Sequence, residues 1–205
     1  MIWSEKAMRW LELIMYLVVL NLLWILGVLA GFGILGIFPA TFALFNVFGD
    51  EELFESQSKI LPIARRYVFY YTKFFFKSNG LALIYATLVT VLYIDWFIIQ
   101  NHEVLQAFLT IPIILILVYI FEVLIFFVLV MIYGKGSFVD KLKLAITAPL
   151  LCSKASFFNL IIFMSGIILA YIYPISLMLI TFSLGTYFIH HVSLNELSEK
   201  QVLIK

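Results

Sequence analysis

The sequence predicts an all-α membrane protein that crosses the bilayer several times. Of its 205 residues, 64% are hydrophobic and 12% are charged, whereas soluble domains carry about 25% charged residues. Several apolar runs reach or exceed the roughly 20 residues that span a bilayer as a helix, and the basic residues gather in alternate loops. We therefore expect a single integral membrane domain over residues 1–205, a polytopic helical bundle of three hairpins with about six membrane segments, the second of them short.

The first apolar run extends from Leu13 to Phe48 without a charged residue. It contains GFGILG at residues 31–36, which has the G-x-G-x-x-G spacing of a dinucleotide-binding fingerprint. That fingerprint functions between a strand and a helix in a βαβ unit. A run this long and apolar provides no such unit, and it contains no basic residue to bind a pyrophosphate. We therefore reject the nucleotide-binding interpretation.

The glycines of this run indicate a turn between two helices. We predict a first helix over about 12–31, a turn at Gly31, Gly33 and Gly36, and a returning helix over about 37–48 with Pro39 in its first turn. The returning helix is only about 18 Å long, well short of the roughly 30 Å hydrocarbon core. It is either a re-entrant arm or part of a bent span. The alternative is a single crossing over residues 13–48, which leaves five spans and an external N-terminus.

Four further stretches are apolar enough to cross the membrane. The uncharged run from Ala155 to Ile189 is too long for one ordinary span, and Tyr171, Tyr173 and Pro174 lie in its middle. Tyrosine favours the membrane–water interface and proline suits a turn, so we divide the run there. The four predicted segments are about 80–100, 104–133, 156–172 and 174–192.

Lysine and arginine residues predict the orientation. The loops at 49–79 and 134–155 and the C-terminal tail are basic, whereas the turns near residues 102 and 173 contain no basic residue. Because basic loops remain in the cytoplasm, we expect these loops and both termini to be cytoplasmic. The thirteen basic residues are Lys6, Arg9, Lys59, Arg65, Arg66, Lys73, Lys77, Lys135, Lys141, Lys143, Lys154, Lys200 and Lys205.

Each of the two basic loops contains a predicted interfacial helix. The first, over about 60–77, mixes aromatic residues with Arg65, Arg66, Lys73 and Lys77, which are candidate lipid contacts. The second, over about 137–152, begins with a capping-box pattern at Ser137 and Asp140. The alternative is that both stretches only anchor the ends of the neighbouring spans.

Several stretches of the chain resemble the YesL-like family of small bacterial integral membrane proteins. They include LNLLWILGVLAGFGILGIFPATFALFNV, FFFKSNGLALI and LYIDW, and the most specific is GIFPAT at residues 36–41. The resemblance extends over about residues 8–190. The family has no established biochemical activity, and its members are typically encoded among carbohydrate-uptake and carbohydrate-degradation genes. It implies a multi-pass protein of the bacterial cell (plasma) membrane with an accessory role in sugar import.

Two polar residues within the predicted spans are candidate functional residues. Glu122 is a carboxylate deep in a span with no basic residue in any span, and such a residue is costly in a membrane. It either relays a proton or contacts a polar substrate, or it is protonated and bonded to Asn21, Tyr119, Thr181 or Ser183. Asn21 itself is expected to form hydrogen bonds between helices.

These sequence features favour some functions and exclude others. We expect no catalytic, cofactor-binding or metal-binding residues and no nucleic-acid partner, and the net charge of +1 by itself indicates nothing about partners. The first hypothesis is a non-enzymatic accessory or regulatory protein whose partners are the lipid bilayer and a carbohydrate transporter or a second copy of the chain. The second is a small transporter or channel-like protein that uses Glu122; a membrane enzyme is the weakest. An apolar groove between helices would favour the first, and a polar cavity at Glu122 the second.

Overall fold

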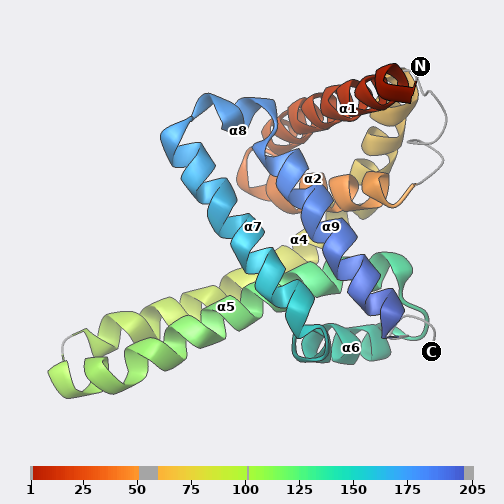
Figure 1. Ribbon diagram of the computed structural model, residues 1–205. Helices are drawn as coiled ribbons and strands as arrows, with labels where there is room; N and C mark the ends of the chain where they lie inside the picture. The colour runs from red at the N-terminus through yellow and green to blue at the C-terminus, as the bar shows by residue number, and fades with distance from the viewer. Residues whose placement is uncertain (1, 51–59, 101, 201–205) are drawn as a thin grey trace. The chain divides into compact units, whose positions relative to one another are not determined.

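The computed structural model describes residues 2–50, 60–100 and 102–200, and every regular element within them is an α-helix (Figure 1). Of the basic residues used to predict the orientation, Lys59 and Lys205 lie outside the described residues, as do the side chains of Lys6 and Arg9. The helices of this part of the chain are α1 (Ile2–Ala30), α2 (Ile34–Phe48), α4 (Ile60–Ile99), α5 (Glu103–Tyr133), α6 (Phe138–Leu151), α7 (Ser153–Ile172), α8 (Ile175–Leu179) and α9 (Thr181–Glu199).

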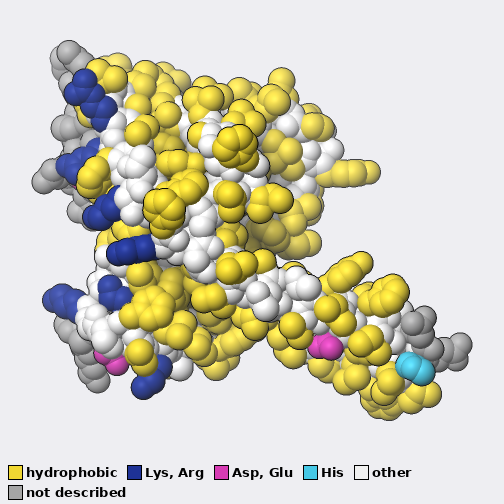
Figure 2. Space-filling model, turned by 180° about the vertical axis from the view of Figure 1, so that it is seen from behind, with side chains coloured by type: hydrophobic (Ala, Val, Ile, Leu, Met, Phe, Trp, Pro, Cys, Tyr) yellow, Lys and Arg dark blue, Asp and Glu magenta, His cyan; other side chains and the backbone are white. Residues whose placement is uncertain are grey.

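Four helices in the described residues are long and apolar enough to cross a membrane, and this supports the predicted membrane helical bundle. Hydrophobic side chains cover much of the surface visible in Figure 2, as expected where lipid is the solvent. The four stretches are Trp10–Ala30, Ile60–Ile99, Val104–Tyr133 and Ser153–Ile172, and α2 is a shorter apolar helix.

The first predicted interfacial helix, over 60–77, is not a separate element. It continues without a break into the stretch predicted to span over 80–100, and together they form the 40 residues of α4. Only Ser78 and Asn79 separate the two stretches, and the second begins with Gly80. A single glycine costs a helix about 1 kcal/mol and does not end it, and the Ser78 hydroxyl donates within the helix to the Phe75 carbonyl, 3.2 Å away.

The last predicted segment, over 174–192, is divided in two. The predicted turn at Tyr173 and Pro174 is present, since α7 ends at Ile172 and α8 begins at Ile175. A second break, which we did not predict, lies at Ile180 between α8 and α9. Neither glycine nor proline stands at this second break, so its cause lies elsewhere in the chain.

The chain forms two compact units. The first unit contains the described residues up to 78 together with 157–192, and the second unit contains the described residues of 79–156 and 193–200. Helices α4, α7 and α9 each contribute to both units.

The core of the first unit forms where α1, α2 and the beginning of α4 meet. The buried positions recur every three or four residues, as they do when one face of a helix is packed. The core residues are Tyr16, Leu17, Leu20, Ala43, Leu44, Val47, Phe48, Ile63 and Tyr67.

In the second unit, α6 packs against α5, and α6 buries small residues. Ala145 and Ala148 are fully buried, and small side chains let two helices approach closely. The predicted capping box is confirmed: the Ser137 hydroxyl accepts from the Asp140 N–H, and the Asp140 carboxylate accepts from the Ser137 N–H. The Ser137 hydroxyl also donates to the Asp140 carboxylate over 2.6 Å. This hydrogen bond first, and then the one from the Ser137 N–H, hold the pKa of Asp140 below its ordinary value.

A tight turn at residues 31–33 joins α1 to α2. The Phe32 N–H donates to the Leu29 carbonyl over 3.0 Å, and the Gly33 N–H donates to the Val28 carbonyl over 2.9 Å. This is the hydrogen-bond pattern of a Schellman motif, whose left-handed residue is usually glycine. Here that residue is Phe32, with φ of 54°, and Gly33 follows with φ of 79°.

The glycines of the turn have two different roles. A Cβ atom on Gly31 would lie 2.3 Å from the Gly36 Cα, and a Cβ atom on Gly36 would lie 2.4 Å from the Val28 carbonyl oxygen. These two glycines therefore let the backbones of α1 and α2 touch. Gly33 has open space around it, and its requirement for glycine comes from its positive φ.

Pro39 lies in the second turn of α2, so its predicted place in the first turn was wrong. The turn is complete by Gly33, and α2 begins at Ile34 rather than near residue 37. At this position Pro39 cannot donate a hydrogen bond to the Leu35 carbonyl.

The contact between Gly31 and Gly36 predicts an asymmetric effect of adding one methyl group. Gly36→Ala should lower stability by about 2 kcal/mol, because the Cβ atom meets backbone rather than a movable side chain. Gly80→Ala is the matched control: a Cβ atom at this helical glycine meets nothing within 4 Å, so stability should be unchanged or rise by up to about 1 kcal/mol. Thermal unfolding of both variants in detergent measures the difference, and equal midpoints would contradict the observed contact.

Candidate functional site

Asn21 joins α1 to the break between α8 and α9. Its side-chain N–H groups donate to the carbonyls of Leu177 and Met178 over 2.9 and 2.8 Å. Its carbonyl oxygen accepts from the backbone N–H groups of Phe182 and Ser183 over 3.0 and 3.1 Å. The residue is 0% exposed, and all four hydrogen-bonding positions of its amide are occupied by backbone.

This arrangement explains why the chain tolerates a broken helix in apolar surroundings. At Ile180 the regular ladder is interrupted, and free carbonyls at the end of α8 and free N–H groups at the start of α9 would be costly in a membrane. The Asn21 amide supplies a partner to both ends. Ser183 adds a further link, because its hydroxyl donates to the Leu17 carbonyl of α1 over 2.6 Å.

Trp24, one turn further along α1, links the same break to α2. Its ring stacks on Phe182, with centroids 3.9 Å apart and an angle of 20° between the planes. Its ring N–H donates to the Thr41 hydroxyl over 3.1 Å. Together Asn21 and Trp24 fix the start of α9 against the first hairpin.

Glu122 lies within α5 and is 3% exposed. Four residues were considered as its partners, and the hydrogen bonds seen for each of them go to other groups. Tyr119 donates to the Ile146 carbonyl, Thr181 to the Ser176 hydroxyl, and Asn21 and Ser183 bond as described above. The burial of Glu122 is compatible with both of the roles considered for it.

The four candidate lipid contacts, Arg65, Arg66, Lys73 and Lys77, are all exposed on the first part of α4. Arg66 lies 3.5 Å from the Asp50 carboxylate. The Lys73 ammonium lies 5.5 Å from the ring centre of Phe69 and 5.4 Å from that of Phe74, within the range of a cation–π interaction. The other side of this stretch, with Ile63 and Tyr67, belongs to the core of the first unit.

An open groove of about 480 Å³ runs between α7 and α9 in the first unit. Its two polar side chains are already bonded, since Ser165 donates to the Ile162 carbonyl of its own helix and Thr181 donates to Ser176. The groove therefore presents an apolar surface. It is lined by Ile162, Ser165, Gly166, Leu169, Thr181, Leu184, Gly185 and Phe188.

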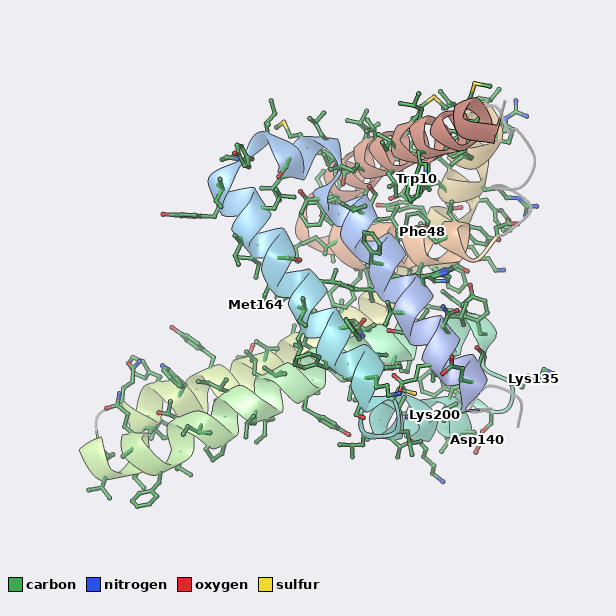
Figure 3. The ribbon with its side chains drawn as sticks, viewed as in Figure 1. Trp10, Phe48, Lys135, Asp140, Met164 and Lys200 are labelled. Atoms are coloured by element: carbon green, nitrogen blue, oxygen red, sulfur yellow. The ribbon has the colours of Figure 1, made fainter. Side chains whose placement is uncertain are left out.

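An ion pair that the sequence analysis missed holds the corner between α6 and α7 in the second unit. Glu196 accepts a hydrogen bond from the Ala155 N–H near the start of α7. Lys200, labelled in Figure 3, donates to the Leu151 carbonyl at the end of α6. The two side chains lie 2.8 Å apart. Each charge lies at the helix end whose dipole it complements. In the sequence, the two residues are four positions apart in the polar tail, which is the spacing of an ion pair on a helix. That spacing did not indicate that Glu196 is buried.

The thiol of Cys152 is enclosed at the same corner. Burial first, and then the Glu196 carboxylate, raise the pKa of this thiol to about 11. A protonated and fully buried thiol is a poor nucleophile. Among the described residues, no three His, Cys, Asp or Glu side chains are grouped to hold a metal ion.

Over residues 17–96 the chain is similar to the family described as "Protein of unknown function, DUF624". It is also 32% identical over 129 residues to the "Uncharacterized protein YteU" of Bacillus subtilis (strain 168). That alignment covers 60% of this chain and 57% of the relative, so the chain spans little more than half of the relative's length. No solved structure matches the chain.

These similarities support a relationship to a small, uncharacterised bacterial family, and they assign no activity. The region matched by the family includes Asn21, the turn at residues 31–33 and the basic stretch of α4. It excludes Glu122, the groove between α7 and α9, and the pair Glu196–Lys200.

The four hydrogen bonds of Asn21 predict a large effect of removing its amide. Asn21→Leu keeps a similar volume but leaves the backbone groups around Ile180 without their partner. Since each unsatisfied buried group costs about 1–3 kcal/mol, the variant should lose at least about 3 kcal/mol of stability. The loss should appear as a lower thermal midpoint and a lower yield of monodisperse protein in detergent.

Two serines provide the matched control. Ser183→Ala removes a hydrogen bond between α9 and α1 and should cost about 1 kcal/mol. Ser165→Ala removes only a bond within its own helix and should leave the midpoint unchanged. Asn21→Leu and Ser165→Ala proteins of equal stability would mean that the Asn21 bonds do not stabilise the break.

Proposed function

We propose that this chain is a non-enzymatic integral membrane protein of the YesL-like family that acts as an accessory or regulatory partner of another membrane protein. The observation that carries the proposal is the apolar groove between α7 and α9. An accessory protein needs a surface that recognises another protein within the bilayer, and a substrate pathway needs polar groups that remain available. The groove fits the first requirement, because its two hydroxyl groups already donate within the chain.

The occupant that suits this groove best is a transmembrane helix of the partner. Gly166 and Gly185 lie in opposite walls, and no atom lies within 4 Å of a Cβ atom built on Gly185. In membranes, where apolar burial does not drive association, helices bind through close backbone approach at such small residues. The hydroxyl hydrogens of Ser165 and Thr181 are already donated within the chain, which favours an apolar helix as the occupant.

The link to carbohydrate uptake and the orientation are further parts of the proposal. The first follows from the resemblance to the YesL-like family alone. The second follows from the distribution of basic residues: both termini lie in the cytoplasm of a bacterial cell, and Arg65, Arg66, Lys73 and Lys77 contact anionic headgroups on that side.

A variant that fills the groove tests the proposal. Gly185→Phe adds a ring where a Cβ atom meets nothing within 4 Å, so the protein should fold and yet lose its partner. Gly80→Phe is the control, because Gly80 is also an open helical glycine and does not line the groove. Tagged chains are crosslinked in native membranes and purified, and sugar uptake is measured in the same strains.

The expected result is that a membrane component of a carbohydrate uptake system is captured with the parent chain and with Gly80→Phe, and that capture falls at least tenfold with Gly185→Phe. Capture that is unchanged by Gly185→Phe would contradict the groove as the docking site. If the chain crosslinks only to a second copy of itself, the partner in the groove is that second copy, and the proposal of a different partner protein is contradicted.

The alternative is a small transporter or channel-like protein, and the observation that favours it is the burial of Glu122. A buried intramembrane carboxylate is costly and commonly functional. The broken helix α8–α9 is a second feature found in transporters, although here Asn21 occupies the groups at the break.

Two substitutions of Glu122 separate the alternatives. Glu122→Gln keeps the shape of the side chain but cannot release a proton, whereas Glu122→Leu also removes its polar group. If Glu122 is structural, Glu122→Gln should complement a deletion strain fully, and Glu122→Leu should reduce the amount of folded protein. Normal folding of Glu122→Gln together with lost complementation would instead favour the transporter. Protein levels are measured in parallel with growth.

A further inference from the structure

The tip of the α1–α2 hairpin is apolar and exposed. No side chain from Ile25 to Ala40 is polar. Phe32 is 93% exposed and Ile34 is 82% exposed, and Leu29 and Leu35 are exposed as well. A loop that reaches water ordinarily carries polar side chains, so this tip is unlike an aqueous turn.

Phe32 has an unusual backbone conformation at this tip. Its φ of 54° places it in the left-handed region, where a bulky side chain is an outlier and glycine is the usual residue. Because the ring is almost wholly exposed, contacts within the chain do not explain why phenylalanine stands there. A conformational outlier of this kind points to a role for the side chain outside the protein.

The exposed tip continues the apolar surface of the hairpin. On α1 the exposed side chains of Met15, Leu22, Leu26 and Leu29 recur at helical spacing toward the tip. They belong to the stretch Trp10–Ala30, which is long and apolar enough to cross a membrane. The surface that faces lipid along α1 therefore extends over the tip without a polar interruption.

The length of α2 places the tip within the hydrocarbon. The helix has 15 residues and is about 22 Å long, compared with a core of roughly 30 Å. Its polar end is marked by Asp50, which pairs with Arg66. A helix that starts from that polar end does not reach the opposite surface, so in this arrangement α1, which is long enough to cross, lies tilted in the bilayer.

The backbone of the turn is suited to this environment. The N–H groups of Gly31, Phe32, Gly33 and Gly36 all donate to carbonyls within the hairpin. Polar backbone groups at membrane depth must be satisfied in this way, and the close contact at Gly31 and Gly36 keeps the turn narrow.

We propose that α1 and α2 form a re-entrant hairpin whose tip ends inside the bilayer, and that Phe32 anchors the tip by contact with lipid acyl chains. Both ends of the hairpin then lie on one side of the membrane, although α2 does not cross it. This inference is independent of the partner suggested for the groove.

Cysteine labelling in intact membranes tests the depth of the tip. The variants are Phe32→Cys and, as a control in the turn between α4 and α5, His102→Cys, which replaces an exposed residue. The parent chain, whose only cysteine is the buried Cys152, gives the background. A membrane-impermeant maleimide is applied to each side of the vesicles, and an environment-sensitive fluorophore is then attached to Phe32→Cys and quenched with nitroxides on lipid acyl chains.

We expect His102→Cys to react with the maleimide from one side of the membrane. In intact membranes, Phe32→Cys should react from either side at less than a tenth of that rate, and it should become reactive once the membrane is dissolved. The fluorophore should be quenched by the acyl-chain nitroxides. Reaction of Phe32→Cys at the rate of His102→Cys would place the tip in water and overturn the proposal. If the fluorophore is shielded from water but is not quenched by the lipid nitroxides, the tip lies in an apolar pocket of another protein rather than in lipid. That result would also overturn the proposal.

Phe32→Gly distinguishes an anchor from a structural residue. Glycine relieves the left-handed conformation, so the thermal midpoint in detergent should stay the same or rise. In vesicles, a cysteine at Ile34 should become more reactive to the maleimide when Phe32→Gly is combined with it. A lower midpoint for Phe32→Gly would show that Phe32 supports the fold itself and would overturn the anchoring role.

Discussion

The four hydrogen bonds of the Asn21 amide are the interaction on which the first unit depends. They supply partners to the last carbonyls of α8 and the first N–H groups of α9, which water would satisfy in a soluble protein and lipid cannot. With these bonds the chain bends at Ile180 without leaving polar backbone unsatisfied. The bend separates α8 from α9, and the groove lies between α9 and α7. A single amide in α1 thus determines whether the surface proposed for partner binding exists.

The second constraint on the first unit is close contact with the helix backbone at glycine residues, which have no side chain to prevent it. At Gly31 and Gly36 the two helices of the hairpin touch directly. At Gly27 the Tyr71 hydroxyl reaches the backbone and donates to the carbonyl over 2.8 Å. In a membrane such contacts replace the burial of apolar surface that stabilises soluble cores. The hairpin is therefore stabilised by shape and by hydrogen bonds to backbone, and this leaves its apolar side chains free to face outward.

The features that the sequence predicted correctly are those determined by residues close together in the chain. Apolar runs predicted the long helices, Pro174 marked one turn, and Ser137 and Asp140 predicted a capping box that is present. The break at Ile180 has no local signal, because its cause is Asn21, more than 150 residues earlier. The continuity of α4 was missed because the polar composition of 60–77 suggested a separate helix, whereas Gly80 alone is too weak a break. The pair Glu196–Lys200 was missed because four-residue charge spacing is the same on a solvated helix and where one partner, here Glu196, is buried.

The distance in sequence between Asn21 and its partners has a consequence for biosynthesis. The amide is made 156 residues before the Leu177 carbonyl and 162 residues before the Ser183 N–H. At about 5–20 residues per second, α1 waits on the order of ten seconds in the membrane before α8 and α9 emerge. During that interval its one amide has to be satisfied by water, by lipid headgroups or by the insertion machinery. A ribosome pause within the later helices would prolong this state, and the amount of correctly folded first unit would then depend on the timing of translation as well as on the final contacts.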